Sequence, residues 1–220
     1  CATCDPKKST SVFTPAADKC VIGGVCYAKD ALGPGGCGRC DPATSAAVWT
    51  PVIGATATTA TFESDLDGYT VSPAVNGVGW QVASLRAKGG TKSLYYGNPV
   101  TQNFTTAQSA NTGTATSAAF TLPAGQKAVL LFSLYMDTET SDKADVLQVK
   151  VGTQVVWAKS RATFSPARYR RWVPISIDLS AYAGQTVSIV FAFDTVDGWS
   201  NGGEGVFIDD ATILSACGAL

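Results

Sequence analysis

Short stretches in which apolar and polar residues alternate dominate the second half of the chain. Residues 145–151, 172–179 and 187–194 place apolar side chains at every second position. The first set is Leu147, Val149 and Val151; the second is Val173, Ile175, Ile177 and Leu179; the third is Val187, Ile189, Phe191 and Phe193. A repeat of two is typical of β-strands with one buried face. These segments are therefore predicted to be strands.

Other segments complete an all-β pattern. Residues 128–136 are apolar on both faces, as expected of a central strand, and residues 206–214 are predicted to close the domain. Pro174 favours an edge position for its strand because proline has no N–H donor. Further strands are predicted at 62–64, 79–83, 93–96 and within 112–122. Long helical periodicity is missing, so the pattern predicts an antiparallel jelly-roll β-sandwich.

The first 50 residues follow a different pattern, which repeats internally. Cys1-Ala-Thr-Cys4-Asp5-Pro6 returns as Cys37-Gly-Arg-Cys40-Asp41-Pro42, and 8 of 15 positions are identical at a shift of 36. Such a repeat indicates architecture, and a unit this small needs cross-links. We therefore expect a disulfide-stapled Cys-rich module at 1–50, a Thr/Ala-rich connector at 51–61 and the sandwich at 62–220.

The cysteine count sharpens this expectation. Six of the seven cysteines lie in the first 40 residues, and the two Cys-x-x-Cys pairs allow a four-thiolate zinc site as an alternative. Because the pairs are equivalent positions of a repeat and the composition is of secreted type, disulfides are favoured. The predicted framework uses Cys4, Cys20, Cys26, Cys37, Cys40 and Cys217, with Cys217 pairing back to the N-terminal module.

An odd number of cysteines leaves one thiol to be explained. It is free, lipidated or joined to another chain. A lipid anchor at Cys1 is the less favoured alternative, because Cys1 aligns with the framework position Cys37.

Composition and charge exclude several functions. The net charge is −1, so no general electrostatic case exists for nucleic acid or an anionic membrane. No apolar run is long enough to span a bilayer. Histidine is absent, and no nucleophile motif or phosphate loop occurs, so no enzyme is predicted. Glu139 and Asp145 could cleave a glycosidic bond in principle, but they are expected at a hairpin.

An ordered series of short motifs gives the chain a resemblance. The motifs are Phe62-Glu63-Ser64, Gly90-Thr-Lys-Ser-Leu-Tyr-Tyr-Gly97, Leu131-Phe-Ser-Leu-Tyr-Met-Asp-Thr-Glu139 followed by Asp145-Val-Leu-Gln-Val, Ile177-Asp-Leu-Ser-Ala-Tyr-Ala-Gly-Gln-Thr-Val187, Phe191-Ala-Phe-Asp-Thr-Val-Asp-Gly198 and Gly205-Val-Phe-Ile-Asp-Asp-Ala211. Residues 62–217 thereby resemble secreted jelly-roll modules: MAM-type modules, the C-terminal domain of immune-inhibitor-A-like metallopeptidases and carbohydrate-binding-module-like sandwiches. The N-terminal repeat resembles those of myxobacterial-type surface proteins.

The resemblance implies a structural Ca²⁺ held by Glu63 on the opening strand and Asp209 or Asp210 on the closing one. A hard cation takes several carboxylate and carbonyl oxygens. Strand alternation sends Asp209 and Asp210 to opposite faces, so one of them is expected to ligate. The alternative is that these carboxylates cap loops or pair with Lys92 or an arginine.

Three further sets of residues are weighed against structural explanations. A second metal or loop site is formed by Asp194, Asp197, Asn201 and Glu204, for which an Asx-turn loop is the favoured alternative. Seven aromatic side chains could stack on sugar rings, although sandwich aromatics are more often core: Trp157, Trp172, Trp199, Tyr95, Tyr96, Tyr135 and Tyr169. Arg168, Arg170 and Arg171, with Arg161 nearby, could grip carboxylated sugars or phosphates, or form a solvated loop.

Two functional hypotheses follow. The first is a non-catalytic extracellular or cell-surface recognition or adhesion module that binds a glycan or a protein. The second is a structural subunit of a fibre or surface layer, assembled as a homo-oligomer through the Cys-rich module and exposed strand edges.

Overall fold

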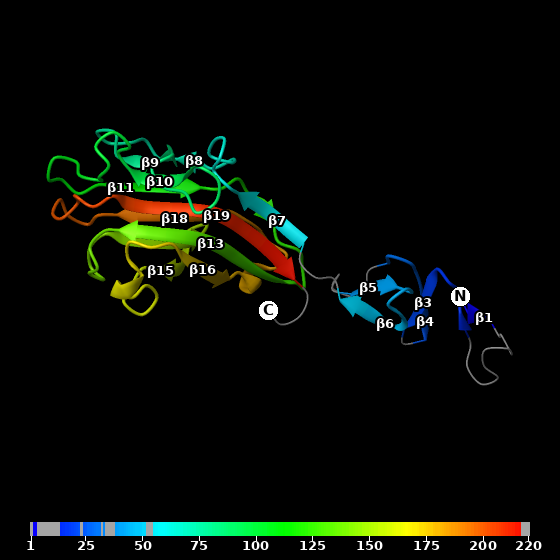
Figure 1. Cartoon of the computed structure of the whole chain (residues 1–220). Coiled ribbons are helices and arrows are strands. Elements are labelled where there is room, and N and C mark those ends of the chain that lie inside the picture. The colour runs from blue at the N-terminus through cyan, green and yellow to red at the C-terminus, as the bar shows by residue number, and fades with distance from the viewer. Residues whose placement is uncertain are drawn as a thin grey trace.

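Two antiparallel sheets packed face to face make up most of the chain (Figure 1). The computed structural model describes residues 2–3, 14–22, 24–31, 33, 38–51 and 55–216. The larger sheet has the order β16 (Val173–Asp178), β13 (Lys127–Asp137), β19 (Gly205–Ala216), β10 (Ser93–Gly97) and β9 (Gly79–Ala83), and β7 (Ala55–Ala60) also pairs with β19. The second sheet has the order β15 (Gln154–Ala158), β14 (Val146–Val151), β18 (Ile189–Asp194), β11 (Thr112–Thr116) and β8 (Thr70–Val71). The predicted jelly-roll sandwich is confirmed.

The core lies between the sheets and follows the alternation read from the sequence. The even-numbered residues Leu130, Phe132 and Leu134 of β13 face Phe191 and Phe193 of β18, and the rings of Phe132 and Phe191 meet edge to face at 5.3 Å. Strand β14 buries every second residue, as predicted. Because each strand turns one face to this core, the side chains on the opposite face of the larger sheet do not belong to it.

Short elements close the ends of the sandwich. Strands β12 (Phe120–Thr121) and β17 (Thr186–Val187) pair with each other, and two 3₁₀ turns, η2 (Pro166–Arg168) and η3 (Ser180–Tyr182), flank β16. Strand β16 stands at the edge of its sheet, as Pro174 predicted. No helix in the described ranges is long and apolar enough to cross a membrane.

The opening strand lies upstream of its predicted position. Residues 62–64 are not a strand; instead β7 forms at Ala55–Ala60, within the residues expected to be a connector. Phe62 has a positive φ of 57°, which ends the extended run. The carboxylate of Asp67 accepts hydrogen bonds from the N–H groups of Thr61 (2.7 Å) and Phe62 (2.6 Å) and fixes this turn.

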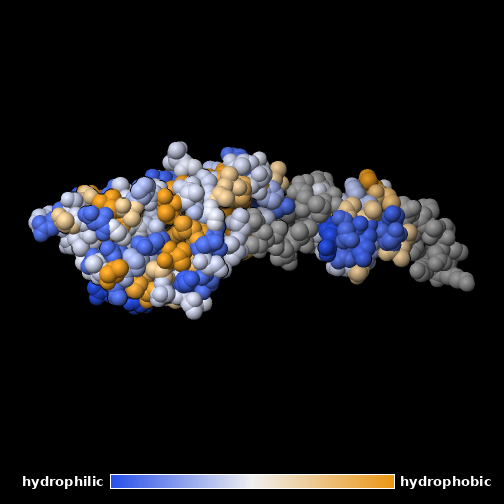
Figure 2. Space-filling view, turned by 90° about the horizontal axis from the view of Figure 1, so that it is seen from above, coloured by the Kyte–Doolittle hydropathy of each residue, from blue (hydrophilic) through white to orange (hydrophobic). Residues whose placement is uncertain are grey.

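The N-terminal strands pair among themselves within the described part of the chain. The pairs are β1 (Ala2–Thr3) with β2 (Thr14–Pro15), β3 (Lys19–Ile22) with β4 (Val25–Ala28), and β5 (Gly38–Asp41) with β6 (Ser45–Pro51). Figure 2 shows hydrophilic side chains gathered on one side of these strands, whereas the same view of the sandwich shows apolar patches between polar ones. Among the described residues of this segment, the buried apolar side chains are those of Cys20 and Cys40.

A disulfide links two of the paired N-terminal strands, β3 and β5, and stabilises this segment. Cys20 and Cys40 are bonded, with Cα atoms 5.7 Å apart, and both are buried. Cys26 is also disulfide-bonded. The Tyr27 and Trp49 rings meet at 4.5 Å beside them. Since Cys40 is oxidised, the alternative four-thiolate zinc site is not formed; the predicted roles of Cys1, Cys4, Cys37 and Cys217 lie outside the described residues.

Candidate binding face

The outer face of the larger sheet carries a second apolar cluster, separate from the core. Ala83, Tyr95, Tyr135 and Phe207 are buried there, and Leu85 and Trp172 pack against them. These residues alternate with core residues along their strands, because successive side chains of a strand point to opposite faces. We call this group the outer aromatic cluster.

Ring geometry shows how the outer aromatic cluster is built. Tyr95 and Phe207 stack with centroids 4.4 Å apart, and Tyr135 meets Phe207 edge to face at 5.6 Å. The Trp172 ring lies 5.8 Å from that of Tyr135 and remains partly exposed. Aromatic pairs in these arrangements are attractive beyond their buried area. The cluster is therefore a firm base that presents one indole to solvent.

Two ion pairs surround Tyr135. Arg86 donates two hydrogen bonds to the Glu204 carboxylate, at 2.5 and 2.6 Å, and its guanidinium carbon lies 4.3 Å above the Tyr135 ring. Arg170 Nε donates to Asp137 Oδ1 at 2.7 Å. The Glu204 N–H donates to the same Asp137 carboxylate at 3.2 Å, which joins the two pairs. The hydrogen bonds that Arg86 donates to Glu204 raise the pKa of Arg86, so this cation is firmly held.

Two shallow hollows lie next to each other along β13 and β16 on the outer face. One hollow is lined by Lys127, Val129, Ser176, Asp178 and Ser180; the next is lined by Leu131, Phe132, Ser133, Pro174, Ile175, Ser176 and Asp210. The two hollows share Ser176, which pairs with Leu131 across the strands. At about 3.3 Å per residue, the stretch of β13 that lines them, from Lys127 to Ser133, spans roughly 20 Å. We call this feature the outer groove.

Residues 84–92, between β9 and β10, lie beside the outer aromatic cluster and carry Arg86. The buried carboxylate of Asp209 accepts hydrogen bonds from the N–H groups of Lys88 (2.6 Å) and Gly89 (3.1 Å). Glu63 accepts hydrogen bonds from the N–H groups of Thr91 and Lys92, at 2.9 to 3.1 Å. These bonds lower the pKa of Glu63. Glu63 and Asp209 thus fasten the loop that positions Arg86.

This geometry bears on the calcium prediction. Among the described residues, no three acidic or cysteine side chains lie close enough to hold a metal ion. The partners of Asp209 are backbone N–H groups, and those of Glu63 are backbone N–H groups and the Thr91 hydroxyl, which donates at 3.0 Å. N–H groups cannot ligate a cation. The arrangement does not fit a calcium ion as it stands. Calcium stays a prediction of the resemblance.

The predicted second acidic site is an Asx-turn loop. Asp194 and Asp197 accept hydrogen bonds from the N–H groups two residues further on, at 2.8 Å each. Asn201 Nδ2 donates to the Asp197 carbonyl, and Glu204 turns away to Arg86. The hydrogen bonds are therefore those of an Asx-turn loop, the alternative that the sequence favoured over a second metal site.

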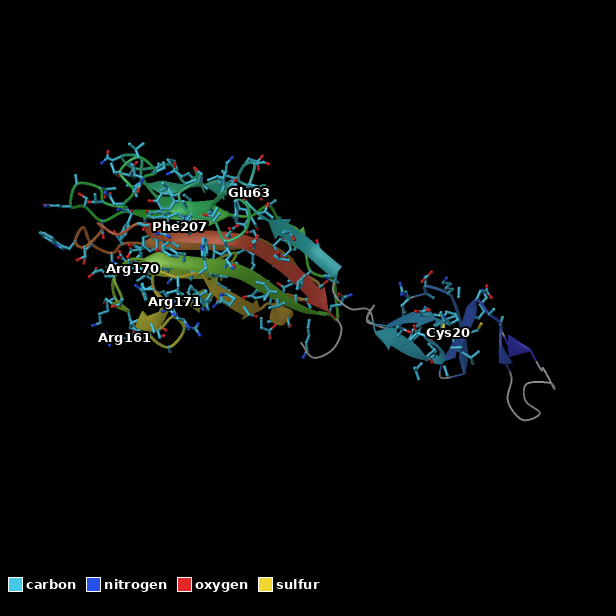
Figure 3. The ribbon with its side chains drawn as sticks, in the orientation of Figure 1. Cys20, Glu63, Arg161, Arg170, Arg171 and Phe207 are labelled. Atoms are coloured by element: carbon cyan, nitrogen blue, oxygen red, sulfur yellow. A yellow bond between two sulfur atoms is a disulfide. The ribbon has the colours of Figure 1, made fainter. Side chains whose placement is uncertain are left out.

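The other predicted ligand-binding residues are distributed over the sandwich. Trp157 and Tyr169 pack against the main core, whereas Trp199 is 68% exposed. Figure 3 shows Arg161, Arg170 and Arg171 near one another at one end of the sandwich. Of the predicted set, only Arg170 and Glu204 belong to the charged group around Tyr135.

The prediction missed Arg86 and Asp137. Arg86 and Glu204 are 118 residues apart, so no spacing in the chain relates them. Tyr95 and Tyr135 of the outer aromatic cluster were among the predicted stacking residues, whereas Phe207, at an outward position of a predicted strand, was not.

The fold and this face define an antiparallel jelly-roll sandwich with a grooved outer sheet. No protein-family profile matches the chain, and no curated protein matches it. Among solved structures, a cyclase from Fischerella sp. TAU is 12% identical, with a TM-score of 0.51 over 76% of this chain and 100% of that one. The CBM22-1 xylan-binding domain from Paenibacillus barcinonensis is 14% identical (TM-score 0.48; 77% and 100% covered). A cleaved adhesin domain of Lys-gingipain from Porphyromonas gingivalis is 13% identical (TM-score 0.46; 75% and 99% covered). At these identities, the likeness to the cyclase shows the fold alone.

Proposed function

We propose that this chain is a non-catalytic extracellular binding module that recognises an extended glycan along the outer groove. The observation that carries the proposal is what this one face combines: hydroxyl and carboxylate side chains line the groove, and Trp172, two residues before Pro174 of the groove, presents a partly exposed indole on a fixed aromatic base. A polymer in an extended conformation matches a groove that follows a strand.

The chemistry of the face suits sugars. A pyranose ring has an apolar C–H face, which can stack on the Trp172 indole, and hydroxyl groups around its edge. Ser133, Ser176 and Asp178 offer hydrogen-bonding groups along the groove. Arg86 and Glu204 add charged donors and acceptors whose geometry is already fixed, so binding costs little ordering of these side chains.

An extracellular location accords with the disulfide. Bonds such as Cys20–Cys40 persist in oxidising compartments and are rare in the cytosol. The location remains part of the proposal.

The alternative is a fibre or surface-layer subunit, for which exposed strand edges are the specific feature. One edge of the larger sheet is β16, where Pro174 removes an N–H donor and hinders strand addition. Sedimentation under reducing and non-reducing conditions discriminates the two functions. Disulfide-linked multimers support the fibre, and a monomer that binds glycan supports recognition.

Titration calorimetry against a panel of soluble polysaccharides tests the glycan proposal. Trp172→Ala and Ser176→Leu, which alter the outer groove, are expected to weaken binding about tenfold, since one stacked ring contributes about 1–1.5 kcal/mol. Trp199→Ala is the matched control, because its exposed ring lies in a different loop. Equal affinity in all three variants and the unchanged protein would exclude the outer groove as the site.

A further inference from the structure

Four of the six arginines in the chain lie in residues 159–172, between β15 and β16: Arg161, Arg168, Arg170 and Arg171. We call this segment the arginine loop. It contains no acidic residue. The concentration is local, because the whole chain has a net charge of −1.

The guanidinium groups of this loop are largely free. Among the described residues, those of Arg161 and Arg171 make no hydrogen bond or ion pair, and Arg168 reaches only the Thr163 carbonyl, at 3.4 Å. All four side chains are exposed. Of the four guanidinium groups, that of Arg170 has an acidic partner among the described residues, Asp137, while the backbone N–H of Arg161 donates to the Asp142 carboxylate at 2.7 Å. Three charges are therefore available to an anion from solvent.

The loop that carries them is firmly anchored. The Phe164 side chain is 1% exposed and meets the Tyr169 ring edge to face at 5.1 Å. Lys159 is buried, and its ammonium group donates to the carbonyls of Glu139 (2.9 Å) and Ala144 (2.6 Å). The Arg170 N–H donates to the Met136 carbonyl at 2.9 Å. Because the backbone is fixed at several points, the loop holds its cations in a defined place.

That place adjoins the outer groove. The arginine loop ends at Trp172, directly before β16. Asp137, the partner of Arg170, belongs to the charged group around Tyr135. Figure 3 shows Arg161, Arg170 and Arg171 at the same end of the sandwich as the start of β19. A polymer lying in the groove would reach these guanidinium groups at its end.

We propose that the ligand of the outer groove is a polyanionic glycan, whose carboxylate or sulfate groups bind the arginine loop. This inference rests on the proposed function. A guanidinium presents planar paired N–H donors that match two oxygens of such an anion. Nucleic acid is not favoured, because the positive charge covers one loop rather than a continuous stripe along the molecule.

The test uses the whole chain and polymers matched in backbone. Polygalacturonate carries carboxylates, and its fully methyl-esterified form removes them; dextran sulfate and dextran form the sulfated pair. We expect the unchanged protein to bind one anionic polymer at least tenfold more tightly than its neutral counterpart. Raising the salt concentration should erase this preference. Whichever anionic polymer binds identifies the anion as carboxylate or sulfate.

The variant Arg161→Gln/Arg168→Gln/Arg171→Gln is expected to lose about tenfold to hundredfold in affinity for that polymer. Lys19→Gln/Lys29→Gln/Arg39→Gln removes the same charge from the N-terminal strands and is expected to bind as the unchanged protein does. Equal losses in both variants would mean that only net charge matters and would overturn the inference.

The outcomes separate this inference from the proposed function. If neutral and anionic polymers bind equally well and Trp172→Ala weakens both, the inference fails and the proposed function stands. If no polysaccharide binds, both fail. Duplex DNA bound as tightly as the anionic glycan would show an unselective polyanion site and would also overturn the inference.

Discussion

Asp145 is predicted to make the protein less stable as pH rises. Its side chain is fully buried, at the hairpin between β13 and β14. One carboxylate oxygen accepts the Glu139 N–H at 2.8 Å, and the other receives no hydrogen bond from the described residues. Burial raises its pKa from 3.8 to about 7, although the Glu139 N–H and the Lys159 ammonium act in the opposite direction. Repulsion by Glu139 and Asp197 adds to the rise.

The sign and size of the effect follow from this pKa. Above pH 3.8 the unfolded chain ionises Asp145, while the folded protein keeps the proton until about pH 7. The folded state therefore binds more protons in this window, and stability falls as pH rises through it. At about 1.4 kcal/mol per pH unit, the loss between pH 4.5 and 7 is about 3 kcal/mol, with little further change above pH 7.

Urea denaturation at a series of pH values, from 4.5 to 8, measures how the free energy of unfolding changes with pH. In Asp145→Asn the titration is absent, and asparagine accepts the local φ of 52°. The difference in unfolding free energy between variant and unchanged protein should shift by about 3 kcal/mol in favour of the variant across the range. Asp142→Asn, at an exposed position of the same hairpin, is the control. A difference that stays constant with pH would refute the reasoning.

Three further predictions concern the outer face. Phe207→Ala should lower the free energy of unfolding by about 3–5 kcal/mol, because its buried ring supports Tyr95 and Tyr135; urea denaturation measures this. Gly90→Ala should destabilise by about 1 kcal/mol or more, since φ is +57° and the new Cβ would overlap the Glu63 carboxylate; faster hydrogen exchange in residues 84–92 is the expected signature. If the predicted calcium binds, a chelator lowers the melting temperature of the unchanged protein and leaves that of Glu63→Ala unaffected; a midpoint insensitive to chelator contradicts a calcium site at Glu63.

The strands were predictable where a large apolar side chain marked every second position. Strand β9 lies at the predicted residues, and the edge position of β16 follows from Pro174. Strand β7 escaped notice because its side chains are only alanine and threonine. It becomes a strand because β19 offers a long partner, with Ala60 opposite Ala211, and pairing of this kind is not encoded in the segment itself.

The candidate site was harder to predict than the fold. Alternation shows that Tyr95, Tyr135 and Phe207 share the face opposite the core, but it does not show what covers that face. The cover depends on Arg86, which reaches Glu204 across the sheet from a loop between two other strands. Contacts between loops distant in sequence depend on the assembled sandwich, so a single sequence holds no local signal for them.

Glu63, near the beginning of the sandwich domain in the sequence, and Asp209, near its end, illustrate how contacts with a distant loop change a prediction made from the sequence. The resemblance implied a cation between Glu63 and Asp209 or Asp210, whose carboxylates would repel each other on neighbouring strands. The structure supplies another source of positive charge, since the N–H groups of residues 88–92 point at both carboxylates. These backbone donors lower the pKa of Glu63, whereas burial raises the pKa of Asp209 in spite of them. Because the same loop carries Arg86, these carboxylates also fix the guanidinium over Tyr135. Glu63 and Asp209 thus belong to the support of the proposed binding face.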